Sequence, residues 1–184
     1  MALIQAGGNR WMRATGAPRA RRVPVAAEEP LGDDRYDYAD AFEIRPREAD
    51  ARSAEQFVRS ALKDASRLVR WTIWIAHRYL IRFRLAPRLS KDHILGWEIL
   101  RSESDVVVLQ AVSPFLQGVI VGRKVDPNRA VITTYVFYTR PTVCRVLLKI
   151  IGPVHRRIAP YLLERAAASA NGVEPQTVPT GRGA

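Results

Sequence analysis

The stretch IIGPVHRRIAPYLLERAAASA, residues 150–170, decides how this chain is expected to fold. Its apolar residues recur at helical spacing and predict the second part of a helix over residues 142–170. Pro153 lacks the backbone N–H that would bond to the carbonyl of Lys149, so we expect a kink at this point. Gly152 leaves room for the bend. We therefore predict one long, kinked C-terminal helix that can follow a curved surface.

Five short runs upstream have the composition of β-strands. The first, RYDYADAFEI at residues 35–44, alternates between an aromatic side and a side of small or acidic residues. The other four follow one another with turn residues between them, which predicts an antiparallel meander. Gly118 and Gly122 in the third of these predict bulges or strand curvature. The four runs are DHILGWEIL (92–100), DVVVLQAVS (105–113), FLQGVIVGRKV (115–125) and AVITTYVFYT (130–139).

Two helices are expected between the first strand and the meander, over residues 51–65 with Asp50 as N-cap and over residues 66–85 up to Pro87. The sheet needs a cover on one face, and only the C-terminal helix is long enough to cross it. The sequence thus predicts an α+β fold in which a curved antiparallel sheet wraps around a long kinked C-terminal helix. A cavity between sheet and helix would be a usual place for a ligand.

The length of 184 residues and the composition, with 47% hydrophobic and 26% charged residues, are typical of one globular domain. We assign this domain to residues 33–170 and expect disorder in an Arg-rich arm, residues 1–32, and in a tail, residues 171–184. The formal net charge of +11 favours acidic partners. Cys144 is the only cysteine, so an intrachain disulfide is excluded and a cytoplasmic location is expected. We expect neither a signal peptide nor a membrane span, and the oligomeric state is not indicated.

Three motifs carry a resemblance to a known group: DYADAFEI (37–44), DHILGWEI (92–99) and GPVHRRIAPYLL (152–163). Together they resemble a bacterial family of unknown function within or near the START-related helix-grip (SRPBCC) superfamily, the polyketide cyclase and lipid-transfer group. The resemblance covers about residues 35–168 and implies the helix-grip fold. It implies no reaction, because the family has none established. The chain lacks the dinucleotide-binding fingerprint found beside some members, and it has fewer recognisable strands than a full seven-stranded helix-grip sheet.

The predicted cavity has two residues that could carry chemistry. Asp40 shares its strand side with aromatic residues and would need a partner in such apolar surroundings. His155 borders the helix side expected to face the sheet. If both face the cavity, they form an acid–base pair suited to proton abstraction or aldol-type cyclisation. The alternatives are that Asp40 points outward and that His155 only packs. The residues predicted to line the pocket are Tyr38, Asp40, Phe42, Trp97, Tyr135 and His155.

The pattern favours binding of a small hydrophobic or amphipathic ligand, with a cyclase- or dehydratase-like enzyme as an alternative. A basic stripe on the helix expected over residues 66–85 suggests a third function, in which this stripe and the Arg-rich arm dock on an anionic membrane or a macromolecule. A solvated cationic face would give the same pattern. Nucleic acid is disfavoured because aromatic residues are not interleaved with basic ones on the strands. The stripe consists of Arg67, Arg70, Trp74, Arg78 and Arg82.

No motif indicates a metal, a cofactor or a nucleophile. The three histidines, His77, His93 and His155, do not have the spacing of metal ligands. The chain has no G-x-S-x-G elbow and no glycine-rich phosphate loop. Cys144 has no supporting motif, and a core role is expected for it. We therefore expect no metal and no cofactor, and the sequence leaves open whether the protein is an enzyme.

Overall fold

The computed structural model of the chain describes residues 17–26, 35–87 and 90–169. The disorder predicted for residues 1–16, 27–32 and 171–184 lies outside these ranges. Within the predicted arm, however, β1 (Arg21–Val23) pairs antiparallel with β2 (Tyr38–Ile44). This part of the arm is ordered because the edge of β2 offers unpaired backbone groups that a further strand can satisfy.

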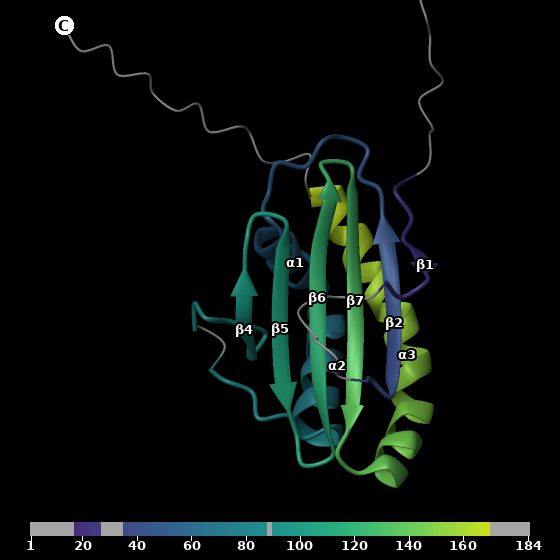
Figure 1. The fold of residues 1–184 in the computed structure, drawn as a ribbon. Coiled ribbons are helices and arrows are strands. Elements are labelled where there is room, and N and C mark those ends of the chain that lie inside the picture. Colours follow the sequence, from purple (N-terminus) through teal and green to yellow (C-terminus); the bar gives the residue numbers. More distant parts are fainter. Residues whose placement is uncertain (1–16, 27–34, 88–89, 170–184) are drawn as a thin grey trace, which may run out of the picture.

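Seven antiparallel strands form one sheet in the order β1-β2-β7-β6-β5-β4-β3 (Figure 1). Strands β4 to β7 form the predicted meander, and β2 pairs with β7, so the first predicted strand lies beside the last. The sheet is therefore larger than the sequence suggests, since β1 and β3 are additional strands. The remaining bounds are β3 (His93–Ile94), β4 (Trp97–Ser102), β5 (Val106–Val112), β6 (Leu116–Asp126) and β7 (Arg129–Tyr138).

The strand expected over residues 92–100 is divided into β3 and β4 by a two-residue turn. Leu95 and Gly96 have φ angles of 53° and 84°, and positive φ at both central residues is what a type I′ hairpin turn requires. A side chain at Gly96 would also come within 2.8 Å of the Leu85 Cβ atom. The turn brings Trp97 into the core, where it is almost fully buried.

Helix α1 (Ala54–Lys63) has Ser53 as its N-cap, not the predicted Asp50. The Ser53 hydroxyl accepts a hydrogen bond from the backbone N–H of Gln56, whose side chain accepts one from the Ser53 N–H, forming a capping box. Asp50 is buried and forms an ion pair with Arg52 at 2.7 Å. The predicted N-cap is wrong because Ser and Asp are equally suited to the position and the path of the chain decides between them.

A single helix up to Pro87 is also not what the structure contains. Helix α2 (Arg67–Ile75) continues into a π-helical turn, η2 (Ala76–Leu80), and Arg82 then ends the helical segment with a φ of 61°. Phe83, the next residue, is buried in the core. Burial of this ring outweighs the helix propensity of the segment, because propensities amount to only about 0.7 kcal/mol per residue or less.

Helix α3 (Pro141–Ser169) is one continuous helix that contains both Pro153 and Pro160, close to the predicted limits. The kink expected at Pro153 stays a prediction. All three α-helices lie on the same face of the sheet (Figure 1), and two of them follow β2 as predicted. The predicted α+β layout, a curved antiparallel sheet with a long C-terminal helix, is confirmed and fits a helix-grip arrangement. In the described part of the chain, no helix has the length and apolar character needed to cross a membrane.

Two glycines of β6 lie in close contact with neighbouring side chains. A Cβ atom at Gly118 would lie 2.8 Å from the Trp97 ring, and one at Gly122 would lie 2.7 Å from a methyl group of Val58. The pairing of β6 with β5 and β7 is continuous at both positions. These glycines therefore admit neighbouring side chains, and the bulges predicted at them are absent from the described strand.

Candidate functional site

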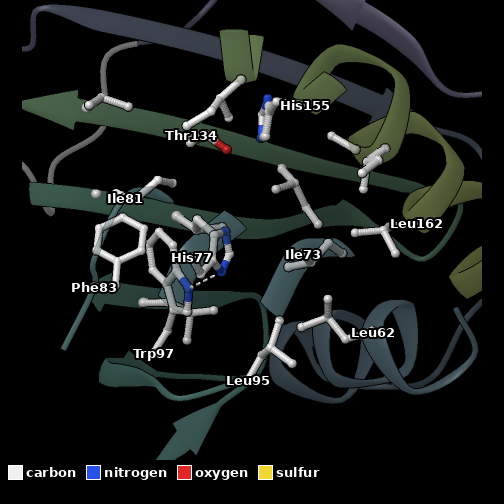
Figure 2. Close-up of a pocket in the computed structure, with 18 of the residues that line it drawn as sticks. Leu62, Ile73, His77, Ile81, Phe83, Leu95, Trp97, Thr134, His155 and Leu162 are labelled. Carbon is white, nitrogen blue, oxygen red and sulfur yellow. Dashed lines mark hydrogen bonds between the residues drawn. The ribbon is translucent and has the colours of Figure 1, made fainter. Parts of the chain in front are cut away.

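A cavity of about 180 Å³ lies between the sheet and the helices that cover it. Figure 2 shows Leu62 of α1, Ile73 of α2 and Leu162 of α3 on its helical side, with Thr134 of β7 on its sheet side. Most of the lining is aliphatic or aromatic, and the polar exceptions are few. In an apolar space of this kind, a small number of polar groups orients a ligand.

Three of the six predicted pocket residues line this cavity: Tyr38, Trp97 and His155. Asp40 is on the same face of β2 and reaches the wall through its contacts with Tyr38 and His155. Phe42 packs beside His155, with 6.3 Å between the ring centroids.

Tyr135 lies on the opposite face of the sheet and does not line the cavity. It pairs with Ala39, so it is out of phase with Tyr38 and Asp40, and side chains of a strand alternate between faces. Its ring is buried among valines of β5 and β6, and its hydroxyl donates to the carbonyl of Ala26 at 2.9 Å. The prediction for Tyr135 is wrong because the phase of β7 depends on its register with β2, which the sequence does not reveal.

Tyr38, Asp40 and His155 form a hydrogen-bonded cluster. The Tyr38 hydroxyl donates to Asp40 Oδ2 at 2.8 Å, and His155 Nδ1 lies 3.3 Å from the same oxygen. A carboxylate can only accept, so Nδ1 of His155 carries the hydrogen, and Nε2 holds a lone pair whenever the ring is neutral. The Asp40 side chain is fully buried, whereas the His155 side chain is about 30% exposed. Strand and helix thus bring together the two residues that the sequence suggested as an acid–base pair.

The surroundings of Asp40 and Tyr38 shift the pKa values of both groups. Burial raises the pKa of Asp40, but the hydrogen bond and charge of His155, with help from Tyr38 and Arg22, outweigh it and hold that pKa below its ordinary value. Burial and the neighbouring Asp40 raise the pKa of Tyr38. At neutral pH Asp40 is therefore a carboxylate and Tyr38 a phenol. Within the described residues, Asp40 Oδ1 is buried without a hydrogen-bond partner.

His77 also lines the cavity, although nothing in its sequence context predicts this position. It lies in η2, and the indole N–H of Trp97 donates to its Nδ1 at 3.3 Å (Figure 2). Burial, together with the charge of His155, lowers the pKa of His77 to about 4. The ring is therefore neutral at pH 7, and because Nδ1 accepts a hydrogen bond, Nε2 carries the hydrogen. A lone His in an apolar helical run was the only signal for it, and that signal is shared by many packing residues.

Two histidines with opposite hydrogen-bonding character thus line one cavity. In its neutral form His155 offers a lone pair on Nε2 with a carboxylate behind the ring, which is the arrangement of a general base. His77 offers an N–H that does not become charged at neutral pH. The cavity can therefore accept a hydrogen bond from a ligand at one histidine and donate one at the other.

The other polar residues considered in the sequence, Cys144 and His93, take no part in the hydrogen bonding of the cavity. Cys144 is buried, its thiol lies 2.9 Å from the Phe115 carbonyl, and burial raises its pKa, so it is not a thiolate nucleophile at neutral pH. The His93 ring bonds to the Ser90 hydroxyl. Among the described residues, no group of three His, Cys, Asp or Glu side chains could hold a metal ion.

The basic stripe is only partly helical. Arg67 and Arg78 are exposed on α2 and η2, and Arg70 and Trp74 are half-buried. Arg82 lies beyond the end of the helical segment and is exposed there. The predicted five-residue helical stripe is thus corrected at Arg82, because the backbone turns at that residue to bury its neighbour Phe83.

No family model and no curated protein matches the chain. Among solved structures, the chain is similar to CalU16 from Micromonospora echinospora, with 15% identity, 84% of this chain and 98% of that chain covered, and a TM-score of 0.28. A similarity of this extent supports no inference about function, so the site has to be interpreted from its own geometry.

Proposed function

We propose that the protein binds a compact, largely apolar ligand with one polar group in the cavity between the sheet and α3. The observation that carries the proposal is an apolar cavity with the Tyr38–Asp40–His155 cluster on its wall. Its volume of about 180 Å³ is close to that of cavities of about 150 Å³ that bind benzene. The ligand class is therefore a single aromatic ring or an aliphatic molecule of similar size, with a hydroxyl placed at His155 Nε2.

Two matched probes, 4-methylphenol and toluene, test this proposal because they differ by one hydroxyl group. We expect both to perturb the NMR signals of Trp97 and His155, and 4-methylphenol to bind about threefold to tenfold more tightly because of its hydrogen bond to His155. Substitution His155→Phe should bring the two affinities together. Substitution Thr134→Phe fills the cavity and should abolish binding of both. Unchanged Trp97 and His155 signals at saturating probe would contradict the proposal.

A second candidate, an acid–base enzyme of cyclase or dehydratase type, is favoured by one observation, the contact of Asp40 with His155 Nδ1. The carboxylate stabilises the ring in the tautomer that leaves Nε2 free to take a proton and stabilises the imidazolium formed. If a ketone occupies the cavity, Nε2 removes a proton from the carbon next to the carbonyl. The electron pair of the broken C–H bond forms a C=C bond, and the π pair of the carbonyl moves to the oxygen, where the His77 N–H can stabilise the charge of the enolate.

Hydrogen–deuterium exchange of the methyl group of acetophenone in D2O measures this step directly. We expect the protein to accelerate exchange, and His155→Gln and Asp40→Asn to remove most of the acceleration while leaving the circular dichroism spectrum unchanged. Acceleration that survives in His155→Gln would exclude this residue as the base.

We also propose that the chain is a divergent relative of the START-related helix-grip superfamily. The order of elements and the helix-grip layout support this relationship, as do the motifs at residues 37–44, 92–99 and 152–163. A cytoplasmic location is part of the same proposal, and it is supported by the single cysteine. An experimental structure that superposes poorly on helix-grip proteins would count against the relationship.

A further inference from the structure

The helices that cover the sheet expose several large apolar side chains to solvent. In α2 and η2, Leu68, Trp71 and Tyr79 are 72%, 59% and 65% exposed. Ordinary monomeric surfaces carry such residues singly, and clusters of them mark interaction sites. We call the following set, together with the basic residues described next, the outer helix surface: Leu68, Trp71, Tyr79 and Leu80 of α2 and η2, and Val143, Val146, Ile150 and Val154 of α3.

The spacing of these residues places an apolar stripe on α3 and a shorter one on α2. Val143, Val146, Ile150 and Val154 follow one another at three or four residues, which places them on one side of α3. On α2, Leu68 and Trp71 are three apart and lie opposite Ile73, which is buried. The inner sides of both helices already line the cavity, so the outer stripes are not needed for the core.

Basic residues flank both stripes, and acidic residues are missing from them. Residues 65–91 contain no Asp or Glu, nor do residues 141–163. The exposed basic residues form no ion pair with a carboxylate in the described part of the chain. They are Arg67, Arg78 and Arg82 beside the first stripe and Arg145, Lys149 and Arg157 beside the second.

We propose that the outer helix surface docks on a membrane that contains anionic lipid. An aliphatic stripe with Trp and Tyr, flanked by Arg and Lys, matches the boundary between acyl chains and negatively charged headgroups. A second copy of this chain fits less well, since it would bring two cationic surfaces together without a carboxylate between them. Nucleic acid fits less well because the aliphatic side chains would stay exposed to water. The inference does not depend on the cavity, and either proposal can fail alone.

Cosedimentation of the full-length protein with lipid vesicles tests the inference. We expect strong binding to vesicles of phosphatidylcholine with phosphatidylglycerol and little binding to phosphatidylcholine alone. Each basic residue near an anionic surface contributes about 1 kcal/mol, so the double substitution Arg67→Gln/Arg78→Gln should lower the partition coefficient about 30-fold. Raising the salt from about 0.1 M to about 1 M shortens the Debye length from about 10 Å to about 3 Å and should also release the protein.

Matched variants distinguish binding through the outer helix surface from binding caused by the net charge of the protein or by non-specific hydrophobic contacts. Arg19→Gln/Lys91→Gln removes the same charge from exposed positions outside both helices and should retain most of the binding. Leu68→Ser/Trp71→Ser should lower the partition coefficient at least about tenfold. Leu100→Ser/Val125→Ser, which changes exposed apolar residues of the sheet, should leave it unchanged.

Four results would overturn the inference. Equal binding to neutral and anionic vesicles would exclude the headgroup contact, and equal loss in the helix and control variants would exclude this surface. A concentration-dependent dimer in analytical ultracentrifugation that Leu68→Ser/Trp71→Ser dissociates would assign the surface to a second copy. Binding to duplex DNA that depends on Arg67 and Arg78 but not on Leu68 and Trp71 would assign it to nucleic acid.

Discussion

His77 should remain uncharged in the folded protein at pH values where an ordinary histidine is protonated. Its pKa is lowered from 6.5 to about 4 by burial and by the charge of His155. The functional consequence is a neutral N–H donor in the cavity throughout the physiological pH range. Protonation would instead place an uncompensated charge in an apolar space and turn Nδ1, which accepts the bond from Trp97, into a donor.

The lowered pKa makes the stability of the protein depend on pH. Between pH 6.5 and pH 4 the unfolded chain binds a proton at His77 and the folded chain does not. The contribution of His77 to the free energy of unfolding is therefore complete above pH 6.5 and is lost as the pH falls towards 4. Each of these 2.5 pH units corresponds to about 1.36 kcal/mol, which gives about 3 kcal/mol in total. Below about pH 4 His77 is protonated in both the folded and the unfolded chain, so it no longer makes the stability depend on pH.

Urea unfolding of the wild type and His77→Gln at a series of pH values from 7 to 4 measures this contribution. Gln can still accept the hydrogen bond from Trp97 but does not titrate, so the other titrating groups cancel in the comparison. From pH 7 to pH 4, the wild type should lose about 3 kcal/mol more free energy of unfolding than the variant. His93→Gln is the matched control, since this histidine bonds to Ser90 outside the cavity.

NMR titration of the His77 ring gives the decisive result. We expect no change in its Cε1–H chemical shift between pH 8 and pH 5.5. A midpoint near 6.5, or equal pH dependence of stability in the wild type and His77→Gln, would refute both the neutral donor and the assignment of the tautomer.

Four further substitutions test the packing, the cluster and the capping. Gly118→Ala should destabilise the protein by about 1–3 kcal/mol, because the added Cβ would lie 2.8 Å from the Trp97 ring. At Gly152 the nearest atom is 3.4 Å away, at the end of a flexible side chain, so Gly152→Ala should be neutral or stabilising by up to about 1 kcal/mol. Thermal unfolding of the two variants compares these effects. Asp40→Asn should lower the free energy of unfolding, measured with urea at pH 7, by about 1–3 kcal/mol. This difference in free energy between variant and wild type should shrink as the pH falls through the lowered pKa of Asp40, below 3.8. Ser53→Ala should lower the free energy of unfolding by about 1 kcal/mol, because it removes the N-cap of α1. An unchanged melting temperature would contradict the capping box.

The features that the sequence predicted correctly depend on local patterns. Alternation in residues 35–44 and helical spacing in residues 142–170 are properties of short segments, and each segment also shows which side of itself faces the core. For this reason Asp40 and His155 could be suggested as partners, and the structure places them 3.3 Å apart. The antiparallel meander was predictable too, because short turns between strands leave few other topologies.

The features that were predicted wrongly or not at all depend on how segments meet. Tyr135 was assigned to the cavity, but its side was set by the register of β7 against β2. β1 exists because the edge of β2 was available, and Arg21–Val23 has no strong strand pattern of its own. α2 ended early because residues beyond it gained burial against the sheet.

The sequence by itself therefore determined the order of β2, the helices and the meander strands, the long C-terminal helix, and the candidate pair Asp40 and His155. Only the tertiary structure decided that Tyr38 joins this pair, that His77 lines the same cavity as a neutral donor, and that Tyr135 lies on the other face. The physical reason is the range of the interactions. Side-chain periodicity is a local property of the chain, whereas strand register, cavity lining and the pKa of a buried group depend on residues far apart in sequence.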